Sequence, residues 1–224
     1  MPYKRRSSHS VRNALVATVI VVIALVSLIE VTHQINQGKP ATPEGVKSTT
    51  PSSNNPTTPA SNESTTPGGA KILLITSMGN ITIQLYNDMP ITSGNFENLT
   101  KHGIYDGTLF SRVARNFVIQ GGDATPKGIV VPPIQDELPN KHHNVKGSVA
   151  MAKTSQPNSA TSQFFINLVN NSAALDSTYV VFGQVIAGWD TVVKISQVPI
   201  TPVLSATDGK PIQPVTIYRA IIVG

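Results

Sequence analysis

The stretch from Phe110 to Asp123, which reads F-S-R-V-A-R-N-F-V-I-Q-G-G-D, constrains the fold of this chain more than any other segment. Two short apolar runs flank a polar turn, a pattern typical of a β-hairpin. Arg112 and Gln120 interrupt the runs at places where strands favour aliphatic side chains. The Gly121-Gly122 pair that follows allows a second chain to approach the backbone closely. The stretch therefore predicts a β-hairpin that lines a groove.

Side chains alternate between the two faces of a strand, so a regular strand places Phe117 and Gln120 on opposite faces. A site that includes both side chains needs a bulge or a strong twist, and the neighbouring glycine pair favours a bulge. Arg112 lies across the polar turn and comes close to them if the two runs pair. Taken alone, the stretch also fits a surface arginine and a core phenylalanine, so a second motif is needed to decide.

A second informative block runs from Gly147 to Asn167 and reads G-S-V-A-M-A-K-T-S-Q-P-N-S-A-T-S-Q-F-F-I-N. We expect a strand over 148–152, a polar loop, and another strand over 163–169. The loop can present backbone amides and small hydroxyl groups to an extended peptide, while the two adjacent phenylalanines point to opposite faces. None of its serines stands in a G-x-S-x-G turn, which argues against a serine hydrolase.

Together the two blocks resemble the signatures of the cyclophilin family of peptidyl-prolyl cis-trans isomerases. That family carries F-x-R-V followed by F-x-x-Q-G-G-D, and then an S-M-A-x run that leads to S-Q-F-F-I. The resemblance covers residues 70–224 and says nothing about 1–69. It implies a mainly β fold, namely a closed antiparallel eight-stranded β-barrel capped by two short α-helices. The many short strands in the sequence suit such a barrel.

The resemblance implies one catalytic residue, Arg112. It also implies that eight residues contact the substrate: Phe117, Val118, Phe165 and Leu175 at the wall of the proline pocket, Gln120 and Gln163 at the substrate backbone, Ala152 beside a neighbouring pocket, and Tyr179 where relatives often have His. Ala174 stands where many eukaryotic members carry Trp, so we expect weak binding of cyclosporin. Because none of the departures removes the arginine, we expect catalysis to survive them.

The implied chemistry suits these residue types. Rotation about a peptide bond meets a barrier of about 18–20 kcal/mol, because the nitrogen donates its lone pair to the carbonyl group. A catalyst needs no nucleophile, metal or cofactor, only a site that binds the twisted amide more tightly than either planar form. A permanent cation beside the bond can donate a hydrogen bond to the nitrogen as rotation localises its lone pair. The sequence therefore predicts an isomerase acting on X–Pro bonds.

The alternative function is a binding module without catalysis. The same groove would then hold proline-containing segments as a scaffold or as a holdase chaperone. The presence of Arg112 argues against this alternative, because a module that only binds needs no cation at the bond that rotates.

The N-terminal part divides into three segments before the isomerase-like domain at 70–224. Residues 1–12 are basic, residues 13–31 hold an uncharged apolar run from Ala14 to Ile29, and residues 32–69 are rich in Pro, Ser and Thr. The apolar run predicts a transmembrane signal-anchor helix, and the basic residues before it place the domain outside the cytoplasm. A cleaved signal peptide or a buried helix is the alternative. The Pro-rich segment predicts a disordered linker, from which the domain would assist the folding of exported proteins.

Composition limits the partners and cofactors. The chain has no cysteine, which excludes disulfides and zinc-thiolate sites. The formal net charge is +5, but the basic residues cluster only within residues 1–12 and form no stripe elsewhere, so we expect no nucleic-acid binding. His142 and His143 lack a third ligand at a familiar spacing and predict a solvated loop rather than a metal site. We expect a monomer that binds proline-containing segments of client proteins.

The remaining segments complete the predicted barrel. They comprise a hairpin over 71–76 and 81–85, a helix over 91–101 capped by Thr92 or Ser93, a long loop over 124–146, a strand over 179–185, a helix over 188–195, a polar connection over 199–214, and a last strand over 215–223 that pairs with the first hairpin.

Overall fold

The computed structural model describes residues 68–224. The predicted basic N-terminus at 1–12, the transmembrane helix at 13–31 and all but the end of the linker at 32–69 lie outside the described residues. Among helices within 68–224, none combines the length and the apolar character that crossing a membrane requires.

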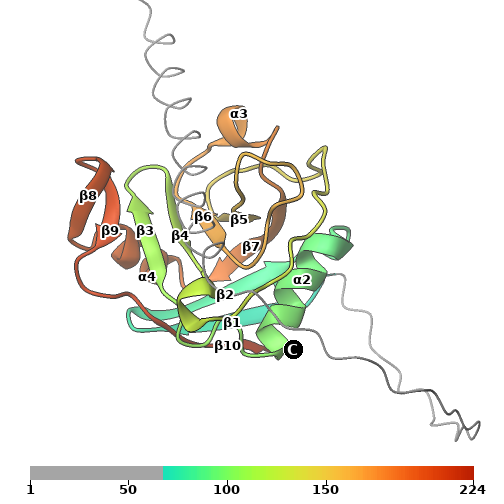
Figure 1. The fold of residues 1–224 in the computed structure, drawn as a ribbon, viewed down its shortest axis with the longest axis horizontal. Helices are drawn as coiled ribbons and strands as arrows, with labels where there is room; N and C mark the ends of the chain where they lie inside the picture. Colours follow the sequence, from blue (N-terminus) through green and yellow to red (C-terminus); the bar gives the residue numbers. More distant parts are fainter. Residues whose placement is uncertain (1–67) are drawn as a thin grey trace, which may run out of the picture.

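The described residues form a sheet of ten antiparallel strands (Figure 1). The strands are β1 (Lys71–Thr76), β2 (Gly79–Leu85), β3 (Phe110–Ala114), β4 (Val118–Gly121), β5 (Ser148–Met151), β6 (Phe164–Asn167), β7 (Val181–Ala187), β8 (Ile200–Ser205), β9 (Asp208–Pro211) and β10 (Ile217–Ile222). Their order in the sheet is β10-β1-β2-β7-β5-β6-β4-β3-β9-β8. The last long strand thus pairs with the first hairpin, as the sequence predicts.

Backbone hydrogen bonds join β10 to the segment that leads into β3. The Gly107 N–H donates to the Ile217 carbonyl oxygen (2.7 Å), the Ile217 N–H donates to Thr108 (2.8 Å), and the Phe110 N–H donates to Val215 (2.8 Å). These bonds connect the first and the eighth strands of the order. The eight strands from β10 to β3 therefore curl round one interior, and β9 and β8 extend the sheet beyond them.

The sheet has ten strands rather than the expected eight, because residues 199–214 contain the β8–β9 hairpin rather than a polar connection. Strand β8 is an edge strand with mostly exposed side chains, so its sequence shows no apolar alternation. It also contains Pro202, a residue that sheets tolerate at their edges. These two features explain why the sequence pattern did not indicate a strand.

Two helices match the prediction and one was missed. Helix α2 (Pro90–Lys101) packs on β10 and β7, and α4 (Trp189–Ser196) packs on β2, β3 and β4. Helix α3 (Ser172–Leu175) is only one turn long, too short to leave a periodic pattern in the sequence. A 3₁₀ turn, η1 (Thr125–Lys127), is the helical element of the long loop over 124–146.

The start of α2 is not capped as predicted, because neither Thr92 nor Ser93 bonds to the free amides of the first turn. Instead, the Glu137 carboxylate accepts hydrogen bonds from the Ile91 N–H (3.0 Å) and the Thr92 N–H (2.7 Å). An acidic group at a helix N-terminus also interacts favourably with the helix dipole. The long loop therefore holds α2 in place from a distant part of the sequence.

Aromatic rings fill the interior of the sheet. Phe164 on β6 meets Phe96, Tyr105 and Phe110 edge-on, with ring centroids 5.3, 5.7 and 5.9 Å apart. Because strand side chains alternate, the next residue, Phe165, belongs to a separate apolar cluster on the outer face. The prediction that the two rings point to opposite faces is confirmed.

Phe164→Ala should lower the free energy of unfolding by about 3–5 kcal/mol, because it leaves a cavity among the three buried rings that contact Phe164. Urea denaturation of the full chain in detergent measures this change. As the matched control, Tyr218→Ala removes an aromatic ring that is 57% exposed, and it should change stability by no more than about 0.5 kcal/mol. Equal effects of the two substitutions would contradict the assigned core.

Candidate active site

The register of four strands places Arg112 on the outer face of the sheet. Arg112 on β3 is the partner of Gln120 on β4, which is the partner of Phe165 on β6. Phe165 in turn is the partner of Ala150 on β5. Paired residues in antiparallel strands project to the same face. The sequence motifs, which lie far apart in the chain, therefore form one continuous strip.

The turn between β3 and β4 explains how Phe117 joins this face. Phe117 precedes β4, and Asn116 before it adopts a left-handed conformation with φ of 58°. Phe117 is thus outside the alternation that would have sent it to the opposite face from Gln120. The hairpin does contain an irregularity, but it lies in β3, where the register shifts between Phe110 and Arg112 and leaves Ser111 as an extra residue.

The glycine pair is required by close packing, as the sequence indicates. A Cβ atom on Gly121 would lie 2.6 Å from the Leu109 carbonyl oxygen, and one on Gly122 would lie 2.7 Å from the Phe164 ring. Gly122 also has a φ of +80°, which other residues rarely adopt. The pair therefore lets β4 pass tightly between the start of β3 and the core.

An apolar wall lies beside Arg112. All six apolar residues expected at the site belong to one cluster, which is separate from the core: Phe117, Val118, Ala152, Phe165, Leu175 and Tyr179. Tyr179 meets Phe165 edge-on at 5.6 Å. Phe117 is the member that remains partly exposed, so it forms the solvent-facing edge of the wall.

Arg112 lies close enough to this wall to affect Tyr179. Burial raises the pKa of the Tyr179 hydroxyl, and the positive charge of Arg112 partly opposes that rise. Arg112 and Tyr179 are therefore within range of an electrostatic interaction on the outer face of the sheet.

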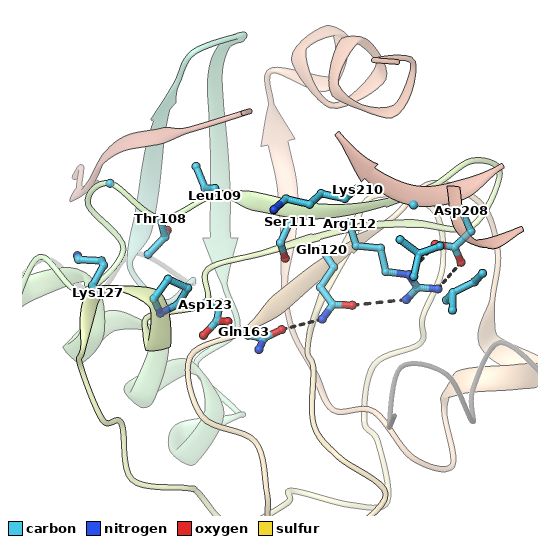
Figure 2. A pocket seen from close by; sticks show the side chains of 15 residues that line it. Thr108, Leu109, Ser111, Arg112, Gln120, Asp123, Lys127, Gln163, Asp208 and Lys210 are labelled. Atoms are coloured by element: carbon cyan, nitrogen blue, oxygen red, sulfur yellow. Dashed lines mark hydrogen bonds and ion pairs between the residues drawn. The ribbon is translucent and has the colours of Figure 1, made fainter. Parts of the chain in front are cut away.

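A polar row runs from Arg112 across the strip (Figure 2). Arg112 Nη1 donates to Gln120 Oε1 at 3.5 Å, and Gln120 Nε2 donates to Gln163 Oε1 at 2.8 Å. The three polar residues expected at the site are thus hydrogen-bonded to one another. We refer to Arg112, Gln120 and Gln163 as the polar row.

Asp208 is the site residue that the sequence did not reveal. Its carboxylate accepts Arg112 Nε at 2.8 Å and Nη2 at 2.5 Å, which makes a two-pronged ion pair (Figure 2). Arg112 is only 9% exposed and Asp208 5%. Asp208 opens β9, where it pairs with Ala114. It stands in a stretch that the sequence predicts as a polar connection, so no sequence signal connected it with Arg112.

The β8–β9 hairpin packs closely where it carries Asp208. A Cβ atom on Gly209 would collide with the Thr201 carbonyl oxygen and lie 2.9 Å from the Cα of Pro202. The two strands of the hairpin therefore approach each other too closely for a larger residue. This packing fixes the backbone from which Asp208 reaches Arg112.

Asp176, which follows α3, ties the long loop to the wall. Its Oδ1 accepts hydrogen bonds from the Asn144 N–H (2.8 Å) and side-chain amide (2.9 Å), and its Oδ2 lies 2.7 Å from His143 Nδ1. The Asn144 side chain also donates to the Tyr179 carbonyl oxygen (3.2 Å). Because Leu175 and Tyr179 flank this carboxylate in the chain, the loop holds both wall residues in place.

The two adjacent histidines point to different partners. His142 stacks on Tyr86 with ring centroids 3.7 Å apart and lies 2.9 Å from Asp88 Oδ1, whereas His143 pairs with Asp176. The sequence predicts a solvated loop, whereas these contacts attach both histidines to other parts of the fold. Within 68–224, no three His, Asp or Glu residues come together in a way that could hold a metal ion.

An antiparallel sheet curled round one interior, with an arginine, two glutamines and an apolar cluster on its outer face, defines a mainly β protein with a candidate site outside its core. The family model for "Cyclophilin type peptidyl-prolyl cis-trans isomerase/CLD" matches residues 71–222. The chain belongs to this family. The enzyme class and the family expected from the sequence are thus confirmed, and so is the mainly β, cyclophilin-like character of the fold.

The chain is also similar to individual peptidyl-prolyl cis-trans isomerases. The chain is 45% identical over 155 residues to a peptidyl-prolyl cis-trans isomerase of Acinetobacter baylyi, an alignment that covers 66% of this chain and 82% of the relative. It is 42% identical over 163 residues to the isomerase cyp18 of Streptomyces antibioticus, with 67% and 97% covered. A crystal structure of a Cryptosporidium parvum cyclophilin-type isomerase in the presence of the dipeptide Ala-Pro matches with a TM-score of 0.62 and 28% identity, over 69% of this chain and 99% of that one.

The contacts of Asp176 predict a loss of stability in acid. Burial acts to raise the pKa of Asp176, but the hydrogen bonds from Asn144 and His143 outweigh it and hold the pKa below its usual value. A carboxylate with a lowered folded-state pKa stabilises the fold above its unfolded pKa of about 3.9, and this contribution disappears as the pH falls through the folded value.

Asp176→Asn should therefore be less stable than the natural protein at about pH 7, and the difference should shrink towards about pH 3. Thermal unfolding of both proteins across this range measures the difference in Tm. A difference that stays constant with pH would show that the Asp176 charge does not stabilise the loop.

Proposed function

We propose that Arg112 catalyses the cis-trans exchange of X–Pro bonds by stabilising the twisted amide, with the apolar wall holding the proline ring. The observation that carries this proposal is the position of Arg112. Arg112 projects to the same face of the sheet as the wall residue Phe165, and Asp208 fixes the orientation of the guanidinium through two nitrogens.

The Arg112 guanidinium has more N–H donors than its neighbours within residues 68–224 accept. A guanidinium has five N–H donors. Among acceptors within residues 68–224, two donors go to Asp208 and one to Gln120, which leaves two donors, one on each terminal nitrogen, for a substrate. As the X–Pro bond rotates, the proline nitrogen regains a localised lone pair that can accept one of them. A donor that is already oriented costs little reorganisation at the moment of rotation, which is where such stabilisation is largest.

The other site residues suit substrate binding. The partly exposed Phe117 supplies apolar surface for the proline ring, and the buried side chains of Val118, Phe165, Leu175 and Ala152 belong to the same cluster. The polar row supplies the remaining contacts: Gln163 accepts from Gln120, so its own side-chain amide can donate to a substrate carbonyl oxygen. The Cryptosporidium parvum neighbour solved with Ala-Pro supports a proline dipeptide as the minimal ligand.

We extend the proposal to partners. The ligands are proline-containing segments of client proteins, and cyclosporin binds weakly because Ala174 offers the wall only a methyl group. The isomerase domain is monomeric. In support of a monomer, the outermost strand β8 contains Pro202, a residue that hinders pairing with the edge of a second sheet.

The substitution Arg112→Ala alone is a poor test, because it leaves the buried Asp208 carboxylate without a partner. Removing one member of a buried ion pair costs about 3–5 kcal/mol of stability. The double variant Arg112→Ala/Asp208→Asn removes both charges. Arg112→Lys keeps the charge but cannot make the two-pronged pair.

The full chain should accelerate exchange of an X–Pro peptide, measured by NMR exchange spectroscopy in detergent. The folded double variant should lose at least about a hundredfold in kcat/KM, because it lacks the oriented donor. Peptide Kd should change by no more than about threefold, because the apolar wall remains. A double variant that keeps full activity would refute the role of Arg112, and a folded natural protein without activity would favour the binding-only module.

We also propose that the domain is held outside the cytoplasm by the N-terminal segment and assists the folding of exported proteins. The support is in the sequence: the uncharged apolar run from Ala14 to Ile29, the basic residues of 1–12 before it, and the Pro-rich segment over 32–69 that can act as a tether.

The protein should stay in the membrane fraction after an alkaline carbonate wash, and its intact mass should include the apolar run. Deletion of residues 1–31 should release it, because the predicted anchor is then absent. An intact mass that matches a chain beginning after the apolar run would show that a signal peptide is cleaved, and it would contradict the anchor.

A further inference from the structure

A cavity of about 500 Å³ lies next to the polar row (Figure 2). Besides the polar row, three separate parts of the chain form its walls: the segment that enters β3, the turn around η1, and the β8–β9 hairpin. A volume of this size is within the range of about 300–1,000 Å³ that is usual for ligand pockets. None of the roles assigned above to the apolar wall uses this space.

The cavity continues the site along the strands. Arg112, Gln120 and Gln163 line it, so the polar row is a shared border. Along β3 and the residue before it, Ala114 lies on the side of the apolar wall, whereas Ser111 and Leu109 lie on the side of the cavity. An extended chain rises about 3.3 Å per residue. A chain that leaves the proline site across the row therefore reaches Leu109 within about three residues.

The chemistry of the cavity favours an apolar side chain. Its apolar lining residues are Leu109, Pro126, Val203 and Leu204. Val203 is 62% exposed, so the hairpin presents this side chain to the space without a partner of its own. Lys210 is exposed, and its side chain extends along the cavity towards Ser111 (Figure 2). The cavity thus combines apolar walls with a polar rim, as expected of a site for a segment of peptide.

We infer that this cavity holds the client chain on one side of the proline and takes an apolar side chain two to four residues away from it. The inference rests on the proposed function, because the polar row must hold the client backbone between the two sites. It gives the β8–β9 hairpin two roles, since Asp208 orients the catalytic arginine while Val203 and Leu204 contact the client.

A peptide series tests this inference with the full chain in detergent. Each peptide has one proline in a Gly/Ser background, with a single Leu placed three residues before or three residues after it, or with no Leu. Kd is measured by fluorescence anisotropy. Leu should tighten binding about fivefold in one of the two positions, either before or after the proline, and not in the other. Fivefold is the gain expected from partial burial of an aliphatic side chain.

The variant Val203→Ser should abolish that gain, and Leu204→Ser serves as the second variant. Ile212→Ser is the matched control, because Ile212 is similarly exposed at 57% but does not line the cavity. It should leave the gain intact. A gain from Leu that is absent on both sides, or that survives both hairpin variants, would overturn the inference while leaving the proposed function standing. Failure of all peptides to bind the natural protein would overturn both.

Discussion

The buried pair between Arg112 and Asp208 is the interaction on which the site depends. A guanidinium that is 9% exposed next to an apolar cluster would be costly without a partner, and the carboxylate that pairs with it arrives from a part of the chain 96 residues away. The pair fixes the plane of the guanidinium and leaves its outer N–H groups free. The same pair therefore makes the charge tolerable and gives it a direction.

The curled sheet makes such an outer site possible. Because side chains alternate, strands β3, β4 and β6 send Val113, Ile119 and Phe164 into the core and Arg112, Gln120 and Phe165 to the outer face. The core can be closely packed without involving the site, and the site can combine polar and apolar groups without weakening the core. The long loop over 124–146 completes the outer face, because its contacts with Asp176 hold the wall residues Leu175 and Tyr179 in place.

The two motifs predicted most of the site, because short-range patterns determine strand pairing and strand pairing determines which residues meet. All nine expected residues are found in the wall or in the polar row. What the sequence could not indicate depends on contacts between distant segments. Asp208 and the Glu137 carboxylate at α2 are single acidic residues in polar stretches, and nothing local distinguishes them from solvated ones. Strand β8 was missed because an exposed edge with a proline lacks the apolar alternation of an interior strand.

The location of the β8–β9 hairpin has a consequence for how this enzyme can diverge. The hairpin lies at the open margin of the sheet, outside the eight strands that enclose the core. Insertions or replacements in the hairpin would leave these eight strands intact. A change in this one peripheral hairpin can nevertheless alter both the setting of the Arg112 guanidinium and the lining of the neighbouring cavity, so the outer face can vary without rebuilding the scaffold.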